Sequence, residues 1–346
     1  MNEVYIAIII IWSFLFIYSI AGSIDFGAGF WAMFYLKRQE TKAASIANRY
    51  LSPSWEVTNV FLVLLVIALV GFFPGAAASL GTLMIVPFCL VLFLLIIRSA
   101  FMVYSYSVQK YSNMLIVISG ITGLLIPALL ISILPAAIGG FIETVGDRQY
   151  ILLNQLFTSP TFYTHIGFGL STELFLSALL LSDYAREAQI ESTFSVYRRN
   201  AIVLGPITLA FAVAAIFTLL PEAAWMVENM VNEWLLFSLS LFAFAIGYSA
   251  LWWPSKKGEI GQPRVAVLLI VAQFGLASFA YGSAHMPYLL YPHLTIYDAF
   301  TNETMFYSLF IGYLIGMALL IPAFILFWWL FMKDKRYLRK DLTTDE

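Results

Sequence analysis

Windows of about twenty mostly apolar residues recur nine times along this chain of 346 residues. A helix needs about 20 such residues to cross the hydrocarbon layer of a membrane, so each window predicts one transmembrane span. Hydrophobic residues make up 61% of the chain and charged residues only 11%, whereas a soluble domain carries about 25% charged residues. The sequence therefore predicts an all-α integral membrane protein with nine transmembrane helices. We expect them near residues 4–36, 54–73, 78–107, 114–138, 160–183, 199–220, 233–253, 264–285 and 305–332.

The basic residues predict the orientation of these spans. Sixteen of the 18 Lys and Arg residues fall in the loops and tail on one side of the predicted membrane, while Arg148 lies on the other side and Arg98 lies inside a span. Because Lys and Arg concentrate in cytoplasmic loops, the N-terminus is expected outside and the C-terminus in the cytoplasm. An odd number of spans fits this result.

Four spans return the chain to the side on which it began, which predicts two like-oriented bundles. Residues 1–158 would form a first four-helix bundle and residues 159–290 a second one. Residues 291–346 would supply an outer loop, a peripheral ninth span and a basic cytoplasmic tail. The segment 221–232 has the composition of a short helix lying on the membrane surface.

Four ionisable residues fall at or inside the ends of predicted spans, where charge is costly. Asp25 and Arg98 each precede a cytoplasmic Lys by 12 residues, and Glu173 precedes Asp183 by 10. At 1.5 Å per residue these three groups lie about 15–18 Å from the cytoplasmic helix ends, in one layer. Glu56 is shallower and lies near the cytoplasmic interface.

Small and polar residues accompany two of these acids. Gly22 and Gly29 flank Asp25 on one helical face, and glycines there allow another helix to approach closely. Span 160–183 carries a polar residue or glycine at every fourth position: His165, Gly169, Glu173 and Ser177. Such a stripe on an apolar helix predicts a face that points inward or towards water.

Two interpretations of the buried charges stay open. Arg98 keeps its proton, so Asp25 or Glu173 is needed as a counter-ion, and a structural ion pair would account for two of the groups. One arginine does not require two buried carboxylates as well as Glu56. The surplus of acids, which extends inward from the cytoplasmic face, indicates a proton-conducting route.

Motifs for other chemistry are missing from the sequence. The single cysteine, Cys89, excludes disulfides within the chain and cysteine metal clusters, and no phosphate-binding glycine loop or zinc-type spacing occurs. The three histidines, His165, His285 and His293, fall near the predicted outer face. A lone histidine near a helix end is more often a packed residue than a ligand, so we expect no haem and no metal on this chain.

Several short motifs carry a family resemblance. Asp25-Phe26-Gly27-Ala28-Gly29 lies in the inner half of the first span, Pro53-Ser54-Trp55-Glu56 opens the second, and Phe73-Pro74 closes it. Arg98 follows the apolar run of the third span. Together with the span plan, these motifs make the sequence resemble subunit II of the bacterial cytochrome bd-type quinol oxidases. Two departures occur: Thr58-Asn59-Val60-Phe61 stands where that family commonly has Asn-Glu-Val-Trp, and Val103 and Ser105 stand where a Glu and a second Arg are often found.

The resemblance implies a function. It implies an aerobic respiratory complex of the bacterial cytoplasmic membrane that oxidises quinol and reduces dioxygen to water, building a proton gradient without pumping. Two b-type haems and one d-type haem would belong to the partner subunit I, and a small single-span subunit could join the heterodimer. Subunit II would carry a proton path from Trp55 and Glu56 to Asp25. The depth argument and the polar stripe add Glu173 and Ser177 to this path.

Two other classes of function compete with this one. A proton-coupled secondary transporter would also carry buried acids and possible repeats, although no pair of broken helices occurs at matching places in both halves. A structural scaffold subunit would use Asp25 and Arg98 only to hold helices together. None of these classes involves nucleic acid.

Overall fold

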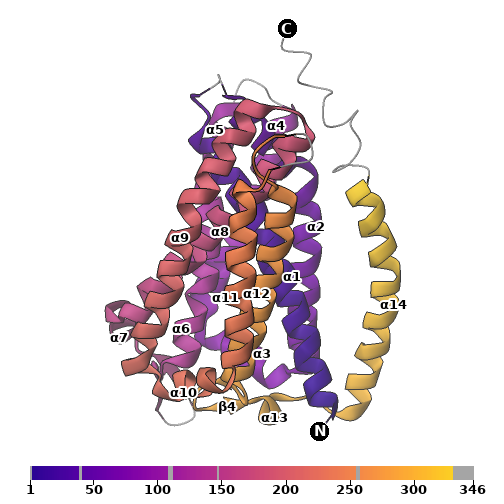
Figure 1. Ribbon diagram of the computed structural model, residues 1–346. Helices are drawn as coiled ribbons and strands as arrows, with labels where there is room; N and C mark the ends of the chain where they lie inside the picture. The colour runs from indigo at the N-terminus through magenta and orange to yellow at the C-terminus, as the bar shows by residue number, and fades with distance from the viewer. Residues whose placement is uncertain (1, 39–40, 108–111, 146–147, 255–257, 330–346) are drawn as a thin grey trace.

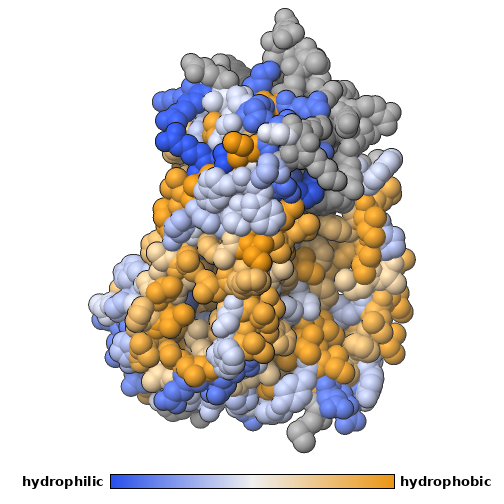
Figure 2. Space-filling model, viewed as in Figure 1, coloured by the Kyte–Doolittle hydropathy of each residue, from blue (hydrophilic) through white to orange (hydrophobic). Residues whose placement is uncertain are grey.

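The computed structural model describes residues 2–38, 41–107, 112–145, 148–254 and 258–329. Within these ranges it gives the backbone alone for residues 51–56, 102–107, 112, 148 and 327–328. The long helices run roughly side by side (Figure 1). An apolar belt covers the middle of the molecule between two more hydrophilic ends, as expected of a membrane protein (Figure 2).

Seven helical segments among the described residues are long and apolar enough to cross a membrane. They are α1 (Asn2–Phe34), α5 with α6 (Ser112–Ile131 and Ile133–Ile138), α8 (Pro160–Glu187), α9 (Glu191–Glu222), α11 with a short 3-10 helix (Trp234–Ser249 and Ala250–Trp252), α12 (Pro263–His285) and α14 (Glu303–Trp328). The prediction of a mostly helical protein with many spans is therefore confirmed. The number of nine and the orientation stay predictions, and residues 330–332 of the last predicted span lie outside the described residues.

The region around the second and third predicted spans differs from the prediction. Helix α2 (Ala43–Phe72) is followed by α3 (Pro74–Leu83), and the two are bent by 114° at Phe73. Pro74 has no N–H to continue the first helix. The predicted span 78–107 is therefore not one helix, because α3 ends at Leu83 and α4 (Ile85–Ser107) begins after it. The apolar part of α4, Ile85–Phe101, is shorter than the seven clear spans, and the bent pair would make an eighth.

Short elements close the predicted outer end of the molecule. Two antiparallel hairpins, β1–β2 (Ile142–Val145 and Arg148–Ile151) and β3–β4 (Tyr288–Leu290 and Leu294–Thr295), lie in the connections between predicted spans, residues 139–159 and 286–304. Three short helices accompany them: α7 (Leu153–Thr158), α10 (Ala224–Asn232) and α13 (Ile296–Ala299). Helix α10 confirms the short helix predicted within residues 221–232 and lies across this end in Figure 1.

Helix α1 occupies a central position in the packing. It contacts α2, α5 and α8, and α8 in turn packs along α9. The largest cluster of buried side chains combines both halves of the chain, as shown by Ile24 of α1, Ile46 of α2, Leu179 of α8, Tyr197 of α9 and Ile270 of α12. Helix α14 stands at one side against α2, and the most apolar window of α14 holds no buried residue. The division into residues 1–158, 159–290 and 291–346 stays a prediction.

Candidate functional site

A buried ion pair links α1 to α4 in the interior of the molecule. The Nη2 atom of Arg98 lies 3.6 Å from Oδ2 of Asp25, and both side chains are only 3% exposed. The same Nη2 donates a hydrogen bond of 3.0 Å to the backbone carbonyl oxygen of Asp25. The two groups that the depth argument placed in one layer are therefore direct partners.

Helix α5 completes the environment of the arginine. The Nη1 atom of Arg98 donates a 2.6 Å hydrogen bond to the carbonyl oxygen of Ser119, and the guanidinium carbon lies 5.0 Å from the centre of the Phe26 ring. A Cβ at Gly29 would come within 3.1 Å of Ser119 and within 3.0 Å of Nη1. A Cβ at Gly123 would come within 2.6 Å of the carbonyl oxygen of Phe26. These two glycines let α1 and α5 close around the guanidinium group.

A second close approach brings α8 against α1. A Cβ at Gly27 would lie 2.2 Å from Oγ of Ser177 and 3.0 Å from the carbonyl oxygen of Glu173. The indole N–H of Trp31 donates a 3.0 Å hydrogen bond to Oγ of Ser177, which donates at 2.7 Å to the carbonyl oxygen of Glu173. The stretch of α8 that carries Glu173 is thus fixed beside the stretch of α1 that carries Asp25.

Glu173 differs from Asp25 in its surroundings. Its side chain has no exposed surface, and neither carboxyl oxygen has a hydrogen-bond partner among the described residues. It interacts electrostatically with Arg98, but the ion pair of Arg98 is made with Asp25. A buried carboxylate without a partner is strongly disfavoured. The carboxyl group of Glu173 is therefore suited to holding a proton.

The polar stripe on α8 faces inward, as the sequence predicted. His165, Glu173 and Ser177 are all buried, with exposed fractions of 4%, 0% and 0%. Nδ1 of His165 donates to the carbonyl oxygen of Thr161 at 2.8 Å when it carries the ring proton, and Nε2 lies 3.5 Å from the hydroxyl of Tyr281. No cluster of three potential metal ligands among His, Cys, Asp and Glu occurs in the described part of the chain.

Three predicted residues remain: Gly22 on α1, and Trp55 and Glu56 on α2. Gly22 lies one turn from Asp25, but a Cβ there would meet Thr58 of α2 only at 3.9 Å and its own helix neighbour Phe26 at 3.3 Å. Gly22 is therefore not the residue that permits the closest helix approach. The predictions for Trp55 and Glu56 fall on side chains outside the described residues, although both positions belong to α2.

Several residues of the site were not found from the sequence. Gly27 stands in the motif around Asp25, but its close contact with α8 was not predicted. For Ser119 and Gly123 the sequence signal is a run of small residues, Ser119-Gly120 and Thr122-Gly123, inside an apolar span. Tyr18 lies seven residues before Asp25 on the same face of α1 and interacts electrostatically with it. The hydroxyl of Tyr18 is buried without a hydrogen-bond partner among the described residues.

The fold and the site define a class of protein before any relative is considered. The chain is a multi-span integral membrane protein in which a buried arginine pairs with a carboxylate of one central helix and a second buried carboxyl group lies on a neighbouring helix. The comparisons with known proteins give the family. The model of the cytochrome bd terminal oxidase subunit II family matches residues 3–331, and the chain belongs to that family.

Two relatives show how far the likeness extends. The chain is 45% identical over 342 residues to the putative cytochrome bd menaquinol oxidase subunit II of Bacillus subtilis (strain 168), covering 98% of this chain and 99% of that protein. It is also similar to a chain in the structure of bd oxidase from Geobacillus thermodenitrificans, with a TM-score of 0.81 and 35% identity over 97% of this chain and 100% of that one. The protein is therefore a multi-pass bacterial membrane protein and a subunit of a quinol oxidase complex.

Proposed function

We propose that the chain is the haem-free subunit of this quinol:oxygen oxidoreductase and provides a proton path from the cytoplasm for the reduction of dioxygen to water. The observation that carries the proposal is the surplus acid. Asp25 already balances Arg98, yet Glu173 is fully buried in the neighbouring helix without a hydrogen-bond partner among the described residues. A purely structural pair does not explain a second buried carboxyl group.

The path would begin at Trp55 and Glu56 near the cytoplasmic end of α2 and reach Asp25, with Glu173 next to it. Arg98 supplies one positive charge that a single carboxylate can balance. When Asp25 accepts a proton, its negative charge is lost, and Glu173 can release its own proton and take over as counter-ion. The proton moves on while the net charge of the cluster stays constant, which avoids the cost of an uncompensated buried charge.

Ser177 lies one turn from Glu173 towards the predicted cytoplasmic end. Its hydroxyl accepts from Trp31 and donates to the backbone of α8. In the proposed path Ser177 fixes the distance between the two acid-bearing helices, and Trp31 supports it.

We place the two b-type haems and the d-type haem on the partner subunit I, against which this chain would pack. The scarcity of histidines supports this placement, because haem iron is commonly held by an axial His and the whole sequence contains three. Of these, His165 has a polar contact at both ring nitrogens, Nδ1 with the carbonyl oxygen of Thr161 and Nε2 with the hydroxyl of Tyr281. The likeness to the Bacillus subtilis protein further suggests menaquinol as the electron donor of the complex.

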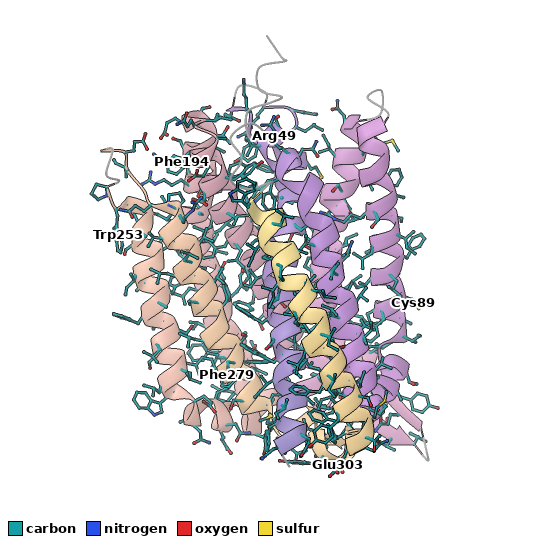
Figure 3. The ribbon with its side chains drawn as sticks, turned by 90° about the vertical axis from the view of Figure 1, so that its right-hand side faces the viewer. Arg49, Cys89, Phe194, Trp253, Phe279 and Glu303 are labelled. Atoms are coloured by element: carbon teal, nitrogen blue, oxygen red, sulfur yellow. The ribbon has the colours of Figure 1, made fainter. Side chains whose placement is uncertain are left out.

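The proposal is tested with Asp25→Asn and Glu173→Gln in the assembled complex. Both variants keep the size of the side chain and remove its proton-carrying ability. We expect normal haem spectra and markedly slower oxygen consumption with quinol, and Glu56→Gln should act in the same direction but more mildly. Glu303→Gln changes an exposed acid at the end of the molecule opposite Arg49 (Figure 3). It is the control and should leave turnover unchanged.

Three outcomes would decide between the competing functions. Normal turnover in both Asp25→Asn and Glu173→Gln would refute the proton path. Loss of assembly in both would favour a structural role. Solute transport by this chain without its partner would support the transporter alternative, against which the family membership argues.

A further inference from the structure

The polar residues of α8 form two groups that are separated along the helix. Glu173 and Ser177 belong to the buried acid cluster, and Ser171 and Thr172 lie directly beside it, whereas Thr161 and His165 lie closer to the predicted outer end. Glu173 and His165 are eight residues apart, which corresponds to about 12 Å along the helix axis. The position between them on the same face is Gly169.

The outer group reaches the surface of the molecule. Oγ of Ser159, at the start of α8, donates a 2.6 Å hydrogen bond to the carboxylate of Glu222 at the end of α9. Glu222 is partly exposed, and it interacts electrostatically with His165. The hydroxyls of Thr164 and Thr218 lie 2.9 Å apart and add a further polar contact between the same helices. Polar groups therefore extend from the outer surface as far as His165.

The interval between the two groups on α8 is the non-polar run Ile166–Leu170. A Cβ at Gly169 would lie 3.1 Å from both Cγ1 and Cγ2 of Ile131, the last residue of α5. One residue away on α8, the ring of Phe168 packs against Phe274 of α12 with ring centres 6.4 Å apart. We call Ile131, Phe168, Gly169 and Phe274 the apolar collar. The absence of a side chain at Gly169 lets Ile131 close directly onto the backbone of α8.

We propose that the apolar collar is a proton barrier that keeps the acid cluster of Asp25 and Glu173 closed to the outer side. This inference rests on the proposed proton path. A protein that contributes to a proton gradient must not connect its buried acids to both surfaces. A tightly packed hydrophobic constriction excludes water and so interrupts proton transfer. Ile131 is the residue whose side chain lies closest to the α8 backbone at Gly169, midway between Glu173 and His165.

The test uses the complete oxidase complex in proteoliposomes without quinol, so that no turnover occurs. A membrane potential is imposed with potassium and valinomycin, and proton entry is followed with a trapped pH-sensitive dye. Ile131→Thr and Ile131→Val form a matched pair, because their side chains have nearly the same shape and differ in one hydroxyl. We expect Ile131→Thr to pass protons several-fold faster than the wild type and Ile131→Val to remain tight. Ile131→Ser, which opens more space, should leak more than Ile131→Thr.

A second substitution identifies the route of the leak. Adding Glu173→Gln to Ile131→Ser should return proton entry towards the wild-type rate, because the leak would have to pass through that carboxyl group. Wild-type tightness of both Ile131→Thr and Ile131→Ser, in complexes with normal haem spectra, would overturn the proposal. A leak that persists unchanged in the double variant would overturn it as well.

The leak assay and the turnover assay separate the two proposals. If Ile131→Ser does not leak while Asp25→Asn slows turnover, the barrier is wrong and the proton path stands. If Ile131→Ser leaks through Glu173 while Asp25→Asn turns over normally, the barrier stands and the proposed function fails.

Discussion

Gly27 is the residue at which the packing of α1 against α8 is most sensitive to a single methyl group. Its missing Cβ leaves room for Ser177, whose Oγ and Cβ would lie 2.2 and 2.6 Å from a Cβ at that position. The backbone carbonyl oxygen of Glu173 would lie at 3.0 Å. Rotation of the serine side chain would remove only the first of these overlaps. We therefore predict that Gly27→Ala forces the two helices apart.

The expected cost follows from these contacts. Ordinary contacts of a Cβ begin at 3.4 Å, so the helices must separate by about 1 Å to accommodate the methyl group. Overpacking of this kind costs about 1–3 kcal/mol, and weakening the hydrogen bond between Trp31 and Ser177 adds about 0.6 kcal/mol, the average for such bonds in membranes. Alanine recovers up to about 1 kcal/mol through its higher helix propensity. The net loss of stability should be about 1–3 kcal/mol.

The measurement compares Gly27→Ala with Gly22→Ala in the purified complex. Gly22 lies in the same helix, but a Cβ there would meet only Phe26 at 3.3 Å and Thr58 at 3.9 Å. Thermal inactivation should occur at a lower temperature in Gly27→Ala, with slower turnover, and should hardly change in Gly22→Ala. Ser177→Gly added to Gly27→Ala should restore part of the loss, so that the two effects are not additive. Equal stability of the two alanine variants, or simple additivity in the double variant, would refute the packing argument.

Two further predictions concern the arginine and the orientation. Arg98→Met removes the counter-ion of Asp25 and should cost about 3–5 kcal/mol, measured as loss of assembled, haem-containing complex. Arg98→Lys keeps the positive charge and should assemble in part, but one ammonium group cannot contact both Ser119 and Asp25 as the planar guanidinium does. A wild-type yield of complex from Arg98→Met would contradict the central role of the pair. The orientation is tested in a background with the exposed Cys89 changed to Ser. A membrane-impermeant thiol reagent is applied to cells whose wall has been removed and whose cytoplasmic membrane is intact; it should label Glu303→Cys and not Lys37→Cys. The reverse labelling pattern would refute the predicted orientation.

An ion pair between Arg98 and a buried acid was predictable because membrane burial makes charge rare and expensive, although the sequence left Asp25 and Glu173 as alternatives and the structure shows the pair with Asp25. Counting residues from the basic loops was enough to place both groups at one depth, and an arginine at that depth requires an acid. The inward direction of the stripe on α8 followed from the same cost. Sequence reasoning therefore works best where a single large energy, here the burial of charge, decides the outcome.

The bend between α2 and α3 could not be predicted in the same way. Residues 74–83 are apolar and small, so a hydropathy window does not distinguish a helix that turns away from one that crosses. Pro74 permits the break, but the contact that accompanies the new direction is distant in sequence: a Cβ at Gly75 would come within 3.1 Å of Cα of Ala299 in α13. A packing contact between segments more than two hundred residues apart leaves no local signal.

The glycines beside Asp25 show why the site needed the structure as well as the charge count. Gly27 lies where α8 meets α1, Gly29 lies where the guanidinium group of Arg98 meets α1, and Gly123 lies where α5 meets α1. Glycine within a helix carries a conformational cost of about 0.5–1 kcal/mol relative to alanine, so three of them around one ion pair are expensive unless close approach is required. Close approach excludes water from the pair and brings Glu173 to the level of Asp25. The same small residues that make the helices fit therefore place the ion pair of Asp25 and Arg98 beside a second buried acid, Glu173, on which the proposed proton relay depends.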